Sequence, residues 1–397
     1  MNVLQKSAWK EAPMLMLISL GLLILPVSNS IGQIPLYAAG LMWLIQFFRR
    51  KTSGNRLTWI MLAGWMVLIL ISLNYAVHPE MGIRKLSRFL IFPLTGAVAA
   101  ACVAGQDVQK RALCLCKSLV LGVSLLGVYD LFHFPYEVFK LGVKFEDVGD
   151  MTSPQFYLVG IMLWLGIVSL DREQVKRIWW GCFPFLLVGL LMHQKRGVWL
   201  ATMVTVGIWT LWSRKWKTLL ALVLMAGVAL CFPFVQVRLE KLKDVIQPTH
   251  GGRMVLWTEV APRVFEKYPW GMGYNGSKYE DFSAVLESAP THIHMEEGLR
   301  HLHNNFLQIR LELGWPGVLW WSLWMGLIYY KAFRRGPPEV VVLRGAVAFA
   351  FMGLFLNGLV EYNFGDSEVL KVYLVLFGLI DAFQPAIKSS EPTKRHT

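Results

Sequence analysis

Charged residues are scarce in this chain. Only 16% of its 397 residues are Asp, Glu, Lys or Arg, whereas 55% are hydrophobic. A soluble globular domain has roughly 25% charged residues, so the composition excludes that class and is typical of a protein that crosses a membrane several times. We find no nucleic-acid-binding module, and we attribute the net charge of +13 to membrane topology and to attraction for anionic headgroups.

Cysteine and internal repetition are also lacking. The longest polar stretch of the chain, residues 237–304, has no cysteine, which excludes a disulfide framework there. The cysteines lie in or beside apolar segments, where packing is their expected role: Cys102, Cys114, Cys116, Cys182 and Cys231. Nine apolar segments precede the polar stretch and three follow it. Such unmatched halves argue against transporters built from repeats.

Apolar segments long enough to span a bilayer recur along the chain. We predict an all-α fold, a polytopic membrane protein with about twelve transmembrane helices. Their centres lie near residues 20, 41, 66, 97, 121, 162, 184, 204, 227, 324, 350 and 376. Twenty Lys and Arg residues lie at the termini and in the loops on one side, and seven lie in the short loops on the other. Since cytoplasmic loops retain Lys and Arg, both termini are predicted to be cytoplasmic.

This topology divides the chain into three regions. Residues 1–236 form a membrane domain with the first nine spans, and residues 306–397 form a second with the last three spans and a cytoplasmic tail. Residues 237–305 form a large external loop, which holds five of the nine histidines. In this loop the apolar spacing predicts a helix over 253–267, kinked at Pro262.

A turn and a second helix complete the loop. The Tyr268–Gly273 segment is rich in turn-forming residues. Asn304 or Asn305 is expected to cap a helix that runs through Leu313 and ends at Gly314, before the next span.

Arginine beside glycine suggests phosphate binding. Gly251 and Gly252 precede Arg253, and glycines allow close backbone approach while a guanidinium adds a bidentate positive charge. A glycine turn with a headgroup-facing arginine explains the same pattern. Arg196, at the edge of a span, either extends to the interface or points into a cavity. Arg84 and Arg88, which share a helical face, present the same alternatives.

Histidines cluster in the segment His301-Leu302-His303-Asn304-Asn305. Two histidines two apart suit a metal ion only if further ligands converge, and we therefore predict no metal. A histidine at a helix start is suited to act as a general base, and His303 is our candidate. In the last external loop, Glu361, Asn363 and Asp366 are placed to border the same cavity, although capping and solvation explain them equally. His292 and His294 are interpreted as solvated surface residues.

With these residues, the chain resembles the O-antigen ligase family, within the broader ligase and polymerase superfamily. The motifs lie between residues 193 and 317. They are Gln194-Lys195-Arg196-Gly197, Gly251-Gly252-Arg253 with Trp257, the 269–273 turn, and His303-Asn304-Asn305 followed by Leu307 and Glu312-Leu313-Gly314. The resemblance extends to the architecture of about twelve spans and one large loop late in the chain, which would be periplasmic.

The resemblance implies a glycosyltransferase of the inner membrane in lipopolysaccharide biosynthesis. It would move O-antigen polysaccharide from undecaprenyl diphosphate to a hydroxyl of the lipid A-core oligosaccharide, without cofactor or metal and with inversion. His303 would be the base, and Arg196 and Arg253 would hold the diphosphate. Arg263, Arg84 and Arg88 are further candidates for the diphosphate, and Asn304 and His301 for orienting the acceptor.

Other functions fit parts of the pattern. A polymerase would join repeat units on the same lipid diphosphate. A flippase or exporter of lipid-linked sugars would need matched halves and charges near the midplane. A non-enzymatic scaffold would need no base. Both proposed substrates of the ligase are lipid-anchored, so its site must open to the lipid bilayer while its polar groups face a protected cavity.

Overall fold

In the computed structural model every regular element among the described residues is a helix, which confirms the predicted all-α fold. The structure describes residues 3–49, 56–104, 107–143, 150, 152–170, 177–216, 233–240, 253–277, 301–334 and 338–383, and scattered residues of 220–231. The first helices are α1 (Val3–Ile24), α2 (Asn29–Phe48), α3 (Arg56–Ser72), α4 (Pro79–Val103), α5 (Val108–Lys140), α6 (Ser153–Val168), α7 (Ile178–Met192) and α8 (Arg196–Trp212).

The second part of the chain adds short helices and three longer ones. They are α10 (Pro233–Glu240), α12 (Arg253–Val255), the π-helix η3 (Leu256–Val260), α13 (Ala261–Lys267), α15 (Asn305–Ala332), α16 (Pro338–Asn357) and α17 (Ser367–Ala382). Eleven of the twelve predicted span centres fall inside one of these helices. The twelfth, near residue 227, lies in a stretch of which only scattered residues are described.

By length and composition, four of the described helical segments can cross a membrane: Asn29–Phe48, Pro79–Val103, Val108–Lys140 and Val340–Asn357. Shorter apolar helices accompany them at Pro13–Ile24, Trp59–Ser72, Ser153–Val168 and Ile178–Met192. The chain is thus an all-α membrane protein, while the count of twelve spans, the three-region division and the orientation of the termini stay predictions.

The helices pack around a core rich in aromatic side chains. The indole rings of Trp209, Trp321 and Trp324 are almost fully buried, and the rings of Trp321 and Phe355 stack with centroids 5.6 Å apart. α17 packs along α4, and α16 packs against α6 and α8. Large apolar side chains such as Phe132 remain exposed on the outside of the helices. Because lipid replaces water there, exposed apolar side chains are expected on a spanning protein.

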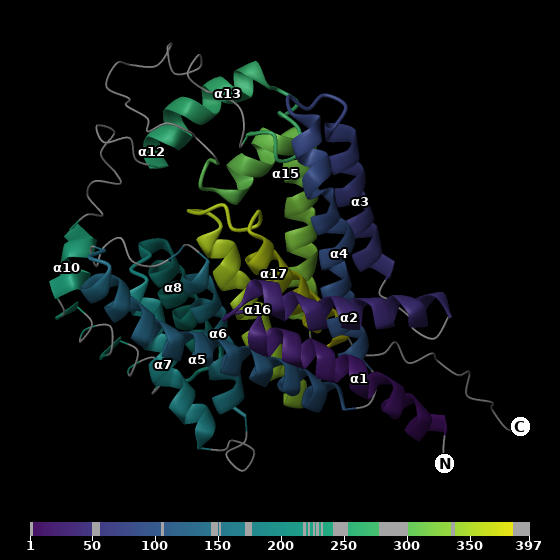
Figure 1. The fold of residues 1–397 in the computed structure, drawn as a ribbon, viewed down its shortest axis with the longest axis vertical. Helices are drawn as coiled ribbons and strands as arrows, with labels where there is room; N and C mark the ends of the chain where they lie inside the picture. Colours follow the sequence, from purple (N-terminus) through teal and green to yellow (C-terminus); the bar gives the residue numbers. More distant parts are fainter. Residues whose placement is uncertain are drawn as a thin grey trace, which may run out of the picture.

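One end of this arrangement carries the polar features and is called the site end below. α1, α5, α7 and α16 finish there, and α2, α6, α8, α15 and α17 begin there. Figure 1 shows α12 and α13 lying across this end, beside the start of α15. Leu256, Val260 and Val264 form a small apolar cluster with Leu302 and Leu311 of the α15 region, which fixes the short helices in place.

The predicted irregularities of the loop helices fall where the backbone chemistry requires them. Pro262 lacks an N–H, and the chain widens into the π-helical turn η3 just before it, where we predicted a kink. Gly314 adopts φ 65° and ψ −165° inside α15, so the predicted end is a kink from which the helix resumes. The 268–273 turn docks on this kink, with Met272 N donating to Leu311 O at 2.7 Å.

Candidate active site

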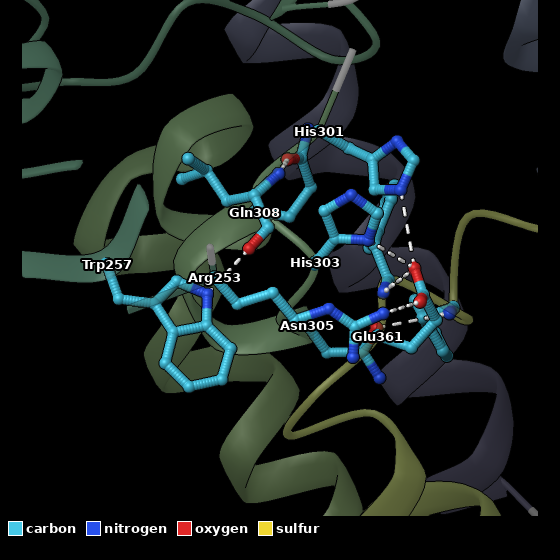
Figure 2. Close-up of polar contacts among 10 residues, drawn as sticks. Arg253, Trp257, His301, His303, Asn305, Gln308 and Glu361 are labelled. Carbon is cyan, nitrogen blue, oxygen red and sulfur yellow. Dashed lines mark hydrogen bonds and ion pairs between the residues drawn. The ribbon is translucent and has the colours of Figure 1, made fainter. Parts of the chain in front are cut away.

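The candidate site is built around Glu361, which lies in the loop between α16 and α17. Its Oε1 is 2.7 Å from Nδ1 of His303 and 3.3 Å from Nε2 of His301, and its Oε2 is 2.7 Å from Nη2 of Arg253. Figure 2 shows both imidazoles and the guanidinium pointing toward this carboxylate. The structure therefore brings together three residues that we predicted from distant motifs, and it adds a carboxylate at their centre.

Hydrogen bonds to the backbone of Leu302 hold the histidine segment in place. Trp257 Nε1 donates to Leu302 O at 2.8 Å, and Leu302 N donates to Gln308 Oε1 at 2.9 Å. His303 itself adopts the left-handed conformation, with φ 49°. Non-glycine residues enter this region at a cost of about 1–2 kcal/mol, so the anchors on both sides of Leu302 stabilise a placement that the residue would otherwise avoid.

The following two asparagines fix the start of α15. Asn304 Oδ1 accepts from Phe306 N at 2.8 Å and from Leu307 N at 3.2 Å, which confirms the predicted cap. Its Nδ2 donates to Leu359 O at 2.7 Å, so the side chain ties α15 to the loop of Glu361. The contacts of Asn304 therefore position the site, and its predicted role toward the acceptor stays a prediction.

Asn305 clamps the same loop from the other side. Its backbone N donates to Gly358 O at 2.7 Å, and its Nδ2 donates to Asn363 Oδ1 at 2.9 Å. A Cβ at Gly358 would lie 2.1 Å from Asn305 Nδ2, a distance that no side chain tolerates. Glycine at 358 is therefore required for the loop to approach α15 closely enough to place Glu361 beside His303.

Two carboxylates around the site have pKa values that are shifted in opposite directions. Burial favours the neutral form of Glu361, but the hydrogen bonds from His301 and His303 and the charge of Arg253 hold its pKa well below the usual range. By contrast, burial and the neighbouring charges of Glu361 and Glu368 raise the pKa of Asp366 to about 7. Glu361 is therefore an anion at neutral pH, whereas Asp366 binds a proton for part of the time.

A third carboxylate, Glu312, lies in α15 just before the kink at Gly314. Burial raises the pKa of Glu312 to about 7, although hydrogen bonds from Gln308 and from the Asn275 backbone oppose the shift. Gln308 Nε2 donates to Glu312 Oε1 at 2.8 Å and to Ser277 Oγ at 2.7 Å. The buried amide of Gln308 therefore connects the backbone of Leu302 to Glu312, two residues before the kink at Gly314.

The other predicted arginines differ in where they lie. Arg196 is the first residue of α8, and a Cβ built on Gly197 would lie 2.8 Å from Val360 Cγ2, so α8 begins against the loop that carries Glu361. Arg88 Nη1 donates to Gly365 O at 2.9 Å in the same loop. Arg263 pairs with Glu259 of the preceding helical turn at 2.9 Å.

Arg84 is exposed on α4. The structure thus places Arg196 and Arg88 beside the Glu361 loop, and it gives Arg263 a carboxylate partner on its own helical segment. Their roles toward a diphosphate stay predictions. Gly251 and Gly252, the predicted phosphate cradle, and His292 and His294 lie outside the described residues.

The histidine pair and Glu361 also satisfy the first requirement for a metal site. One ligand atom from each of His301, His303 and Glu361 lies within 4.8 Å of the others. The Arg253 guanidinium already pairs with the second carboxylate oxygen at 2.7 Å, and its positive charge opposes a cation at the same position. The arrangement therefore favours an ion-paired, hydrogen-bonded base over a metal centre.

Chemically, the site combines an oriented imidazole with a guanidinium at one end of a membrane bundle. This defines a class of protein that can activate a hydroxyl and hold an anionic leaving group at the membrane surface. Residues 180–322 match the family model described as O-antigen ligase, and this confirms the resemblance found in the motifs.

Curated relatives extend the similarity over most of the chain. A protein of Rickettsia bellii named "Putative polysaccharide ligase" is 25% identical over 81% of this chain and 78% of its own length. A protein of Rickettsia felis with the same name is 26% identical over 82% of this chain and 80% of its own length. The family match includes Arg196, Arg253 and His303 and ends before Glu361.

Glu361 is expected from the sequence only as a neighbour of the cavity, because 58 residues separate it from His303. Its local signal is a polar run, Glu361-Tyr362-Asn363, between two apolar helices at the site end. Trp257 belongs to a family motif, but the sequence does not show that its ring holds the Leu302 backbone, and Gln308 belongs to none of the motifs.

Proposed function

We propose that this protein is a polysaccharide ligase that transfers O-antigen polysaccharide from undecaprenyl diphosphate to a sugar hydroxyl of the lipid A-core, at the periplasmic face of the inner membrane. The observation that carries the proposal is the 2.7 Å contact between His303 Nδ1 and Glu361 Oε1. The family match and the names of the relatives support ligation of a polysaccharide. The motifs of the sequence support the choice of donor and acceptor.

The pairing of His303 with Glu361 fixes which ring nitrogen acts. Because Glu361 is anionic, it accepts a hydrogen bond from Nδ1–H of His303, and the lone pair of Nε2 is left to take a proton. In the proposed step, His303 Nε2 removes the proton from the acceptor hydroxyl while the oxygen forms a bond to the anomeric carbon. Glu361 stabilises the imidazolium that results.

The leaving group is the lipid diphosphate. As the new C–O bond forms, the bond from the anomeric carbon to the diphosphate oxygen breaks and its electron pair stays on that oxygen. Arg253 is placed to neutralise this charge, with Arg196 as its partner from the start of α8. One displacement of this kind inverts the anomeric carbon. Arginines can fill the electrostatic role that a divalent cation has in many sugar-nucleotide enzymes.

The test uses the purified full chain after treatment with chelator. Transfer of glycan from lipid-linked polysaccharide to core lipid is followed for the wild type, for His303→Ala and for His78→Ala. His78 is a matched control, since it is 31% exposed and has a glutamate 3.7 Å away. We expect loss of transfer only with His303→Ala, and full activity of this variant would overturn the assignment of the base.

The same assay separates ligation from polymerisation. When lipid-linked repeat units are supplied without core acceptor, a ligase leaves their length unchanged, whereas a polymerase lengthens them. Growth of the chains in this arm would replace the ligase assignment with the polymerase. Retention of the donor's anomeric configuration in the product would contradict the single displacement.

A further inference from the structure

A cavity opens at the site end, beside the start of α17. It has a volume of about 580 Å³. Its walls come from the α1–α2 turn, the last turns of α5, the start of α6, the end of α7 and the start of α17. Two of these walls adjoin the candidate active site, because His193 lies three residues before Arg196, and Glu368 lies seven residues after Glu361.

The charge of this cavity is opposite to that of the arginine-bearing site. Among the described residues that line it, four are carboxylates, two are histidines, and none is Lys or Arg. These residues are Asp130, Glu137, Asp150, Glu368, His133 and His193. Carboxylates at this density repel a diphosphate, so the anionic part of the donor is not the ligand that this cavity suits.

Most of the acidic groups are already hydrogen-bonded within the protein: Asp150 to the 152–153 segment, and Glu368 to Asn29 and Ser367. Asp130 Oδ2 accepts from Tyr157 Oη at 2.5 Å and is 2.9 Å from His193 Nε2. The side chain of His193 is only 3% exposed, and its Nδ1 has no hydrogen-bond partner within the described structure. Glu137 is 3.9 Å from His133, too far for a strong hydrogen bond. The Glu137 carboxylate, whose side chain is 26% exposed, can therefore accept hydrogen bonds from a ligand in the cavity.

Aromatic rings supply the second requirement for binding a sugar. Tyr129 lines the cavity, is 49% exposed and stacks on His133 with ring centroids 4.9 Å apart. Phe134 and Phe156 also line the cavity but are only 2% and 4% exposed, so Tyr129 is the more accessible ring. A pyranose has an apolar C–H face that packs on an aromatic ring and hydroxyls that donate to carboxylates. The cavity presents both kinds of surface, and its volume is in the range of pockets that take small organic ligands.

We propose that this cavity binds a saccharide residue, neutral or amine-bearing, of a glycan substrate, while the diphosphate is held at Arg253. The assignment rests on the proposed function for its biological setting, although binding itself can be measured without transfer. The glycan belongs either to the lipid-linked donor or to the core acceptor. The chemistry of the cavity is the same for both, and kinetics distinguishes them.

The experiment compares Tyr129→Ala with Tyr136→Ala in the purified full chain. Tyr136 is on the same helix, is 54% exposed and does not line the cavity, so it is a matched control. Initial rates are measured against donor and against acceptor, each with the other substrate saturating. We expect Tyr129→Ala to raise one KM about five- to tenfold with kcat within twofold, and the substrate whose KM rises supplies the sugar. Tyr129→Phe, which keeps the ring, should restore the wild-type KM.

Direct binding measurements distinguish the cavity assignment from the proposed function. The probes are core oligosaccharide freed of lipid and phosphate, glycan released from the donor, and undecaprenyl diphosphate without sugar. Tyr129→Ala should weaken binding of one glycan by about the same factor and leave binding of the sugar-free diphosphate unchanged. If the wild type binds glycan in this way and transfers none, the cavity assignment stands and the ligase fails.

If the wild type transfers glycan while Tyr129→Ala and Tyr136→Ala behave alike in both KM values and in binding, the cavity assignment is overturned and the ligase stands. A uniform loss in every Tyr129→Ala assay, diphosphate binding included, would count as misfolding of that variant. Glu137→Gln, which keeps the shape of a partly exposed side chain, then decides: unchanged glycan binding and KM would overturn the cavity.

Discussion

At the site end, two histidine–carboxylate contacts among the described residues are shorter than 3 Å, and they are alike in distance but different in surroundings. His303 is 2.7 Å from Glu361, and its side chain is 28% exposed beside Arg253. His193 is 2.9 Å from Asp130, and its side chain is 3% exposed in the wall of an acidic cavity. The pairing alone therefore does not define a general base. An imidazole also needs access to a hydroxyl and a neighbouring cation for the leaving group.

The largest difference is expected when each histidine is replaced. His303→Ala should lower kcat by about 10²- to 10⁴-fold, because proton removal by a positioned base contributes this much. His193→Gln should cost less than about tenfold, since this side chain is 3% exposed and cannot reach a substrate hydroxyl. Both are measured by glycan transfer, with gel filtration in detergent as the check on folding. Equal losses in two folded variants would remove the distinction between the pairs.

The carboxylates offer the next test. Glu361→Gln keeps the size of the side chain but removes the charge that selects the tautomer of His303 and balances Arg253. We expect kcat to fall about 10³- to 10⁴-fold, since neutralising the orienting carboxylate of a catalytic triad costs about 10⁴-fold. Asp130→Asn should leave kcat within about tenfold. A Glu361→Gln enzyme with wild-type kcat would show that His303 is oriented by other contacts.

Glu312 sharpens the comparison because its partner in the structure is an amide rather than a histidine. Its pKa of about 7 in the folded protein exceeds the ordinary value of 4.5, so the folded protein binds more protons between these pH values. Stability therefore falls as pH rises through this window, by on the order of 3 kcal/mol above pH 7. Glu312→Gln should raise the thermal midpoint at pH 8 and have little effect at pH 4.5. A gain that is equal at both pH values would contradict the raised pKa.

Arg253→Lys tests whether the cation beside the first pair acts through its shape. Lysine keeps the charge but cannot contact Glu361 and a phosphate with a planar fork. We expect kcat/KM for the donor to fall about tenfold, with the KM of the acceptor unchanged. Unchanged donor kinetics would show that a point charge suffices.

The smallest effect is expected at Arg263. Its guanidinium is paired with Glu259 on its own helical segment and bonds to that residue's backbone oxygen. Arg263→Gln should therefore change transfer by less than about twofold, because exposed pairs of this kind contribute little. A loss as large as that of Arg253→Lys would place Arg263 in the diphosphate site. The assay is the same donor titration.

The elements of the site were predictable where the signal is local. The cap at Asn304 follows from its position before an apolar helix, and the break at Gly314 follows from glycine and proline spacing. The convergence of Arg253 and His303 was expected only through the family motifs. The cap and the break are set by neighbours within a few residues, whereas the convergence is not visible in local spacing.

What remained hidden depends on contacts between distant segments. Glu361 reaches His303 because Asn305 clamps the loop at Gly358, and no periodicity reports such a contact. The left-handed backbone of His303 follows from the anchors on Leu302, one of them 45 residues away. The acidic cavity is likewise assembled from five separate parts of the chain, whose residues look like ordinary helix ends when they are considered one by one.

The position of Glu361 in the chain has a consequence for biogenesis. A ribosome delivers Arg253, His301 and His303 well before it delivers the α16–α17 loop, so a partly inserted polypeptide holds unoriented imidazoles and an unpaired guanidinium. The lipid carrier could be gripped at that stage but its glycan could not be released efficiently. Under the proposed function, the base and its orienting carboxylate therefore come together only when α16 and α17 are in place.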